Sequence, residues 1–461
     1  MPPGATSVLA AFAARTAWND VSDAARRVTG LVLLDGIGCC VAAQETQVAR
    51  LAVGAARRLG SGTAPIIGTA HRCGVLGATL ANGILTYALD FEAVGPEGHV
   101  VAAALPAALT LGAASGKTVV EVLLALAVGL EVGGRVGIGV RRTRKPGGPQ
   151  VVRGNNHAIF GAVAAAGRLL GLDAVRMQNA FGIAGYSAPP PTLTRCMSNP
   201  PVPDIKYDNL GFAAQLGVQA ALLAAGGVTG DVTILDGDSG FWRFTGAPEC
   251  DWDGMVAGVG DEWILPQTWF KRYPNSLYAA PAVDALGIVQ REHGLIADDM
   301  TAVRVYARQP TPVARQIRPT TSSGAGLSLP MNLACFAHGV HPRAAWHDPA
   351  VYRRDDLIAF AERVQLLPLE RTGPTRPAWE GSAPVHLEVD ASGRTYSADV
   401  SGLPRLSEQE ILEKFRENVS AFQDPERAAR VAALVLEDSP SLATSALLAE
   451  FDRTRIGRSG T

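Results

Sequence analysis

The chain has 461 residues, a length at which a single hydrophobic core is unusual, so we expect two domains. Apolar residues make up 47% of the chain and charged residues 18%, which is a globular composition and excludes a disordered chain. The formal net charge of -2 creates no broad positive field, so we expect neither a nucleic-acid partner nor binding to an anionic membrane.

The first half of the chain predicts one helix after another. Residues 1–18 contain no basic leader before their apolar stretch, so we expect no signal peptide and a cytoplasmic protein. Residues 30–43 are apolar on nearly all sides and predict a central helix. Residues 118–137 and 211–227 continue this pattern, with Gly and Ala spaced so that neighbouring helices can approach closely.

Two long uncharged runs, residues 99–116 and 210–230, are rich in Gly, Ala, Gln or Pro rather than in Leu and Ile. They predict buried helices and not membrane spans. Residues 139–156 and 185–205 are rich in Pro, Gly, Arg and Asn, and they predict loops.

The pattern changes after about residue 266. Residues 300–310 alternate as a strand does, and residues 385–400 form two alternating runs around Asp-Ala-Ser-Gly, which predicts a hairpin. Residues 406–415 open a helical tail with a Ser-x-x-Glu capping signal. The predicted fold is mainly α, with a helical domain of residues 1–266 and 405–461 and a smaller α+β lid of residues 267–404.

The residues that bind metals or carry out redox chemistry show no clear pattern. None of the six cysteines stands in a CxxC pair, and the eight histidines lack metal-ligand spacing, so we expect free thiols and no metal. Lysine is the informative residue, because it can accept a proton when its pKa is lowered whereas arginine cannot. The 41 basic residues include only five lysines: Lys117, Lys145, Lys206, Lys271 and Lys414.

Seven stretches, in this order, resemble the MmgE/PrpD family: LLDGIGCCVAA, ANGILTYALDFEAVGPEGH, LPAALTLGAASG, LLGLDAVRMQNAFGIAG, IKYDNLGFAAQLGVQAALLAAGGVTG, WFKRYPNSLYAAPAVDA and LSEQEILEKF. That family includes 2-methylcitrate dehydratase, cis-aconitate decarboxylase and iminodisuccinate epimerase. The resemblance implies a helical domain built from both chain ends, an inserted α+β lid and a cleft between them. It also implies a homodimer and no cofactor.

The resemblance places Asp90 and His99 in the cleft, in a segment similar to the family's Asp-Phe-(Asp/Glu) and His-Pro stretch. We expect His99, oriented by Asp90, to be the principal acid or base. The structural alternative is a helix-terminal Asp and a loop His that make only local bonds.

Lys206 and Lys271 match the family's Lys-x-x-x-x-Gly-x-Ala-Ala and Lys-x-(Tyr/Phe)-Pro motifs. The resemblance implies that both ammonium groups face the cleft, where they hold a carboxylate or stabilise an enolate-like charge. An isolated lysine is usually a solvated surface residue. Lys414 also matches a family position, but its helix looks like a surface helix, so we interpret Lys414 as structural.

Six further residues are candidates for binding the substrate. His157 precedes a Gly/Ala-rich helix, as a family histidine does, and Arg153 lies close by. Three positions depart from the family, since Asn209 and Tyr278 replace histidines and Met331 replaces a tyrosine. Buried carboxylates need polar partners, so these losses predict a substrate with fewer charges than a tricarboxylate, unless Arg153 or Arg272 supplies the contact instead.

These residues predict a cofactor-free lyase or isomerase that moves a proton next to a carboxylate or carbonyl of a small substrate. Dehydration, decarboxylation, epimerisation and double-bond migration all fit. We expect a role in secondary metabolism. Two alternatives stay open, an isomerase or cyclase of a less charged natural product and a non-catalytic binding protein that keeps the fold. Convergence of Asp90, His99, Lys206 and Lys271 on one site would favour an enzyme.

Overall fold

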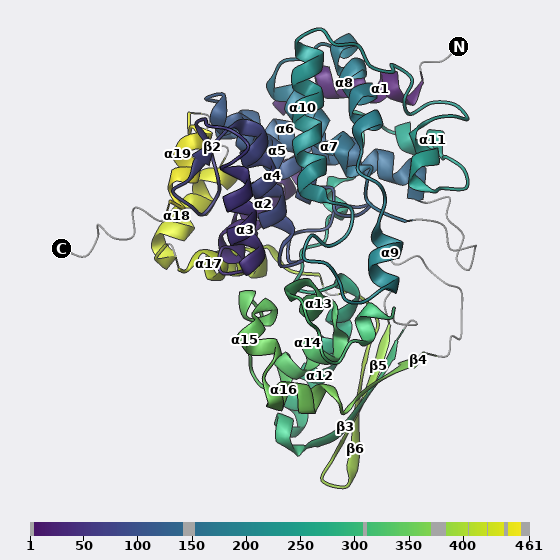
Figure 1. Cartoon of the computed structure of the whole chain (residues 1–461), viewed down its shortest axis with the longest axis vertical. Helices are drawn as coiled ribbons and strands as arrows, with labels where there is room; N and C mark the ends of the chain where they lie inside the picture. The colour runs from purple at the N-terminus through teal and green to yellow at the C-terminus, as the bar shows by residue number, and fades with distance from the viewer. Residues whose placement is uncertain are drawn as a thin grey trace, which may run out of the picture.

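The described part of the chain is mainly helical and contains two hydrophobic cores (Figure 1). One core is built largely from residues 5–270 and 411–451, and the other from residues 273–398. The computed structural model describes residues 4–141, 153–307, 311–369, 384–403, 405–421, 423–437 and 441–452.

The first core is enclosed by helices that pack closely through small residues. A Cβ added to Gly83 would lie 2.6 Å from the Cα of Gly211, so these two glycines allow α4 and α10 to touch. The close approach expected from the Gly and Ala spacing is therefore present. The helices of this region are α1 (Ala5–Arg15), α2 (Asp23–Ala43), α3 (Gln47–Ala56), α4 (Val75–Tyr87), α5 (Val101–Ala114), α6 (Val119–Arg141), α7 (Ala158–Leu169), α8 (Ala174–Ser187), α9 (Leu193–Ser198), α10 (Leu210–Ala225) and α11 (Trp252–Val256), with the short strands β1 (Ala64–Pro65) and β2 (Arg72–Cys73).

Both uncharged runs form helices of this first core, α5 and α10, as the sequence predicted. In the described residues, no single helix is long and apolar enough to cross a membrane. The pair α2 and α3 reaches that length and composition only across a bend of 99°. Most of α2 is buried inside the molecule.

The second core packs helices against a four-stranded sheet with the strand order β4-β3-β5-β6. Strand β3 runs parallel to β4 and antiparallel to β5. Ser392 and Gly393 have φ angles of 51° and 74°, which is the left-handed geometry of a tight turn, so the predicted hairpin is confirmed. The elements are α12 (Ala280–His293), β3 (Met300–Ala307), α13 (Ser322–Leu327), α14 (Leu329–Ala337), α15 (Pro349–Tyr352), α16 (Asp355–Ala361), β4 (Val364–Pro368), β5 (Val385–Ala391) and β6 (Arg394–Val400).

The C-terminal helices lie against the N-terminal ones (Figure 1). Helix α17 (Glu408–Val419) and α18 (Pro425–Leu436) pack on α2, and α19 (Thr444–Ala449) packs on α5. The predicted cap of α17 is present, since Ser407 and Glu410 form a reciprocal capping box. The domain boundaries at 266 and 405 stay a prediction.

A seam of hydrogen bonds joins the two regions where α13 meets the loop before α10. The Thr321 hydroxyl donates to the Val202 carbonyl at 2.7 Å, and the Ser323 hydroxyl donates to the Asp204 carbonyl at 3.3 Å. Within the second region, the buried ring of His347 contacts the carbonyls of Ser322 at 3.0 Å and of Pro274 at 2.8 Å, which braces the start of α13. The seam thus fixes α13 next to the residues that lead into Lys206.

Candidate active site

Asp90 lies between the two lysines that the sequence singled out. Its side chain pairs with Lys271 Nζ at 2.6 Å and with Lys206 Nζ at 3.5 Å, and all three side chains are buried. Lys271 Nζ also donates to the Asp90 carbonyl at 2.8 Å. Lys206 Nζ donates to the carbonyl of Tyr87 at 3.0 Å, at the C-terminus of α4, where a cation is favoured by the helix dipole.

The shared carboxylate affects the two lysines differently. Burial raises the pKa of the Asp90 carboxyl, but Lys206 and Lys271 outweigh burial and hold this pKa below its usual range. Burial lowers the pKa of Lys271, but the charges of Asp90 and Glu92 and the hydrogen bond to Asp90 together outweigh burial, and the pKa ends above the usual value. For Lys206 burial dominates and the pKa is lowered. Lys271 is therefore a fixed cation, whereas Lys206 is the lysine better suited to exchanging a proton.

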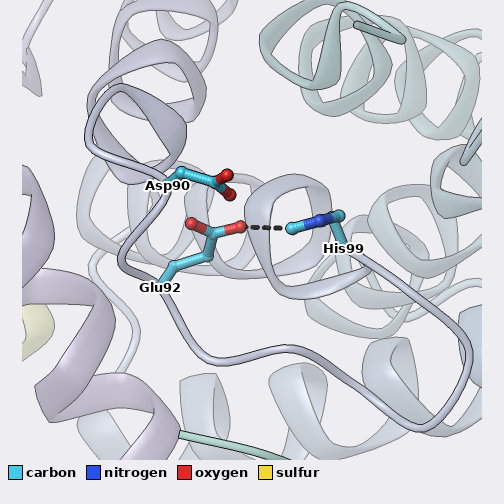
Figure 2. Close-up of side chains that lie close together, drawn as sticks. All are labelled: Asp90, Glu92 and His99. Atoms are coloured by element: carbon cyan, nitrogen blue, oxygen red, sulfur yellow. Dashed lines mark hydrogen bonds and ion pairs between the residues drawn. The ribbon is translucent and has the colours of Figure 1, made fainter. Parts of the chain in front are cut away.

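His99 is oriented by Glu92 and not, as the sequence suggested, by Asp90. His99 Nδ1 lies 2.5 Å from Glu92 Oε1, the contact drawn in Figure 2. Asp90 and Glu92 leave the same loop, two residues apart, but only Glu92 reaches the imidazole (Figure 2). A carboxylate only accepts hydrogen bonds, so Nδ1 carries a hydrogen, and in the neutral imidazole Nε2 then offers a lone pair. The expected Asp–His pair is corrected to a Glu–His pair.

Two phenols complete the group, and the sequence analysis missed both. The Tyr207 hydroxyl lies 3.1 Å from His99 Nε2. Tyr87 contacts the rings of both His99 and Tyr207 edge to face, and Lys206 Nζ lies 3.7 Å from the centre of the Tyr87 ring. Burial raises the pKa of both phenols well above 10, so both carry their proton near neutral pH.

Backbone strain is concentrated around this group. Asp90 and Lys206 have φ angles of 49° and 59°, and Asp208 and Asn209 have 65° and 47°. Residues other than glycine rarely adopt this left-handed backbone conformation, and each instance costs about 1–3 kcal/mol. Such clusters occur where the surrounding fold holds functional side chains in place, so the strained backbone supports a functional role for Asp90 and Lys206.

The loop that carries Asp90 and Glu92 is held from both ends of the chain. Asp35 Oδ2 of α2 accepts from the Ala93 amide at 2.9 Å, and Lys414 Nζ of α17 donates to the Phe91 carbonyl at 2.6 Å. Asp35 and Lys414 also pair with each other at 2.7 Å. Lys414 is buried, so the expectation of a surface-like helix position was wrong, although its structural role fits these contacts.

Asn209, His157 and Arg153 have three different surroundings. Asn209 lines, with Lys206, a cavity of about 10 Å³ that is large enough for roughly one water molecule. His157 is fully buried and its Nε2 contacts the Glu97 carbonyl at 2.8 Å, so it supports the loop that leads to His99. The Arg153 side chain is exposed.

The structure does not bring the other three candidates into the group. Arg272 is partly exposed and pairs with Glu410 at 2.9 Å, and Tyr278 is 58% exposed. Met331 is fully buried in α14 inside the second core. Position 331, where the family resemblance implied a tyrosine, therefore supplies only apolar packing.

Asp90, Glu92 and His99 could in principle hold a metal ion, because one donor atom of each lies within 4.8 Å of the others. The chemistry of the surroundings disfavours this. A cation at that point would compete with Lys271 and Lys206 for the Asp90 carboxylate. The same arrangement suits acid–base chemistry, with a carboxylate-backed imidazole beside two ammonium groups.

Comparison with known proteins identifies the family of the chain. The family model of the MmgE/PrpD N-terminal domain matches residues 7–251, and that of the MmgE/PrpD C-terminal domain matches residues 273–438. Cis-aconitate decarboxylase of Homo sapiens is 28% identical over 51% of this chain and 51% of its own length. Cis-aconitate decarboxylase of Aspergillus terreus is 28% identical over 63% of this chain and 61% of its own length.

The chain thus spans between half and two thirds of these two decarboxylases. A longer match, over 91% of both chains, is with the cis-aconitate decarboxylase-like protein oryM of Aspergillus oryzae, at 25% identity. The two family models together cover most of the sequence and meet where the two cores divide. This chain belongs to the MmgE/PrpD family.

Proposed function

We propose that this chain is a lyase of the dehydratase or decarboxylase type, acting next to a carboxylate of a small substrate without a cofactor. The observation that carries the proposal is the convergence of Asp90, Lys206, Lys271 and the Glu92–His99 pair in one buried group. This convergence favours an enzyme over a non-catalytic binding protein. The similarity to cis-aconitate decarboxylases points to the same reaction class.

In the proposed reaction, negative charge develops on the carbon next to the carboxylate and spreads onto its oxygens. Lys271, a fixed cation, and Lys206 stabilise this charge in a site from which bulk water is excluded. The Glu92–His99 pair gives or takes the proton at carbon. Loss of carbon dioxide, loss of hydroxide or reprotonation then determines the product.

We further propose that the substrate carries fewer carboxylates than a tricarboxylate and belongs to secondary metabolism. Arg153 and Arg272, the two arginines that were candidates to replace the missing family contacts, lie at the surface, and Arg272 is already paired. An extra buried carboxylate without a cationic partner would cost roughly several kcal/mol.

The test is the exchange of substrate hydrogens for deuterium, together with carbon dioxide release, across a panel of mono-, di- and tricarboxylic acids. We expect exchange or decarboxylation of a mono- or dicarboxylate, and its loss in Lys271→Ala. Turnover of cis-aconitate or 2-methylcitrate at about 1–1000 per second would contradict the lower charge of the substrate. An inert wild-type protein across the whole panel would contradict the proposed function.

We expect activity to survive metal removal, because Asp90 is already neutralised by two lysines. Purified protein dialysed against a strong chelator should keep its full rate, and elemental analysis should show no stoichiometric zinc or iron. A rate that disappears with the chelator and returns with one metal would show that Asp90, Glu92 and His99 are ligands after all.

We also propose a homodimer, as the family resemblance implies, in the cytoplasm. Helix α10 offers a surface for a second copy, because Phe212, Leu222 and Leu223 expose apolar side chains along it. The mass in solution, measured by light scattering, tests this proposal.

A further inference from the structure

Both ring nitrogens of His99 are occupied in the folded chain. Nδ1 faces the Glu92 carboxylate at 2.5 Å and Nε2 faces the Tyr207 hydroxyl at 3.1 Å. When the imidazole is neutral and its hydrogen faces Glu92, the Tyr207 hydroxyl is the donor toward Nε2; when it is an imidazolium, Nε2–H donates to the Tyr207 oxygen. An imidazole in this state has no free nitrogen for a substrate. Any proton that His99 exchanges with a substrate must therefore pass through Tyr207, unless the phenol moves away.

The surroundings of Tyr207 suit such a transfer. Its side chain is 5% exposed, and its backbone directly follows Lys206, whose Nζ lies 5.9 Å from the Tyr207 ring centre. The ammonium group is thus close enough to favour a transient negative charge on the phenol. Burial and Asp90 raise the pKa of Tyr207 well above 10, so the resting phenol is neutral and its proton needs an acceptor such as His99.

The Tyr207 phenol supplies a hydroxyl group that the side chain at position 331 lacks. Met331, at a position where the family resemblance implied a tyrosine, is sealed inside the second core and has no hydroxyl group. The phenols of this site come instead from the first core, Tyr87 at the end of α4 and Tyr207 before α10. Of these two, Tyr207 is the one in hydrogen-bond contact with the imidazole.

We propose that Tyr207 is the residue that passes the proton between the substrate carbon and His99, so that Glu92, His99 and Tyr207 form a relay. The inference rests on the proposed lyase function and adds the identity of the group that meets the substrate. The sequence alone does not single out Tyr207 for this role; its contact with His99 Nε2 does.

The relay balances in both directions. When a substrate C–H bond breaks, its proton goes to the Tyr207 oxygen while the phenol proton goes to His99 Nε2, and the resulting imidazolium is held by Glu92. When carbon dioxide leaves, the electron pair of the broken C–C bond stays on carbon and takes the phenol proton. In this direction His99 starts as the imidazolium held by Glu92, and its Nε2–H returns a proton to the Tyr207 oxygen. The neutral imidazole that is left takes up a proton from solvent before the next turnover.

The test is a double-mutant cycle on the full-length protein with the substrate found in the exchange panel. Tyr207→Phe and His99→Gln should each lower kcat by roughly 10²–10⁴-fold, with little change in KM. The double variant should lose no more than the worse single variant, because residues that act as one unit are not additive. Tyr87→Phe, which removes the neighbouring hydroxyl but keeps its ring, is the matched control and should lose far less.

Losses that multiply in the double variant, or a Tyr207→Phe enzyme with the wild-type kcat, would overturn the relay. Thermal unfolding of each variant separates a folding defect from a chemical one. Nitrogen NMR of the His99 ring gives an answer without any substrate. Tyr207→Phe should move the Nε2 resonance and leave the Nδ1 hydrogen in place. An unmoved Nε2 resonance would overturn the relay, whether or not a substrate is found. An exchange panel that reveals no substrate would instead contradict only the proposed lyase function.

Discussion

Replacing Glu92 with Gln is expected to lower kcat by about 10²-fold, nearly as much as replacing His99 itself. Glu92 holds His99 Nδ1 at 2.5 Å and is fully buried, so no water can take over its role. Glutamine keeps the size of the side chain but loses the negative charge that stabilises an imidazolium. The rate is measured by deuterium exchange or carbon dioxide release at saturating substrate.

Asp90→Asn provides the contrast for this prediction. Asp90 pairs with Lys271 at 2.6 Å, so its loss leaves a buried ammonium group with a weaker partner. We expect Asp90→Asn to lower the melting temperature as well as the rate, while the nitrogen resonances of His99 stay nearly unchanged. Glu92→Gln should shift those resonances. The opposite outcome, with His99 responding to Asp90→Asn and not to Glu92→Gln, would restore the pairing that the sequence suggested.

The sequence predicted most of the fold because helices and hairpins leave local signals. The apolar run at residues 30–43 lies within α2, and the alternating runs at residues 385–400 form β5 and β6 around a two-residue turn. Lys206 and Lys271 could be identified because lysine is scarce in this chain and because both match family motifs. Both lysines pair with Asp90, from which Lys206 is separated by 116 positions and Lys271 by 181 positions in the sequence. No local sequence pattern can predict contacts over such separations.

The pairing of His99 was mispredicted because spacing does not determine which carboxylate faces a ring. Asp90 has a left-handed backbone with a φ of 49°, and this turn separates the directions of Asp90 and Glu92. Such a conformation is unusual outside glycine and leaves no reliable trace in the sequence. Tyr207 was missed for a different reason: a tyrosine beside a motif lysine is usually a packing residue.

Lys414 shows what a closer sequence analysis could have found. Asp35 is a lone charge inside the apolar segment LLDGIGCC, and a buried carboxylate requires a cationic partner or a hydrogen-bond donor. With only five lysines available, Lys414 was a candidate for that partner. Its helix is amphipathic, and position 414 lies three residues after Ile411 and one before Phe415, on the buried stripe, so the periodicity also pointed to a buried Lys414.

Lys414→Met is expected to destabilise the protein by roughly 3–5 kcal/mol, because it leaves Asp35 buried without its cation. Asp35 and Lys414 are both buried and their charged atoms lie 2.7 Å apart. The variant also loses the hydrogen bond to the Phe91 carbonyl, which helps to hold the loop of Asp90 and Glu92. The free energy of unfolding is measured by denaturant titration at pH 8, where an unpaired Asp35 costs most.

The destabilisation should shrink as the pH falls. Burial already raises the pKa of Asp35 above its ordinary value, against the opposing effect of Lys414, and removal of Lys414 raises it further. Between the ordinary pKa of about 3.9 and the raised one, the folded variant binds more protons than the unfolded chain, so its stability falls as the pH rises through this window. The gap to the wild type should therefore be smaller at pH 5 than at pH 8.

The double variant Asp35→Asn/Lys414→Met is the matched control. Asparagine at position 35 carries no charge, and its side-chain oxygen can still accept from the Ala93 amide, as Asp35 Oδ2 does. Because replacing both members of a buried pair costs less than removing one, we expect the double variant to regain most of the lost stability. The stability of the double variant itself should no longer depend on the charge of residue 35. If Lys414→Met alone unfolds at the wild-type denaturant concentration at pH 8, the pair does not hold the Asp90 loop in place.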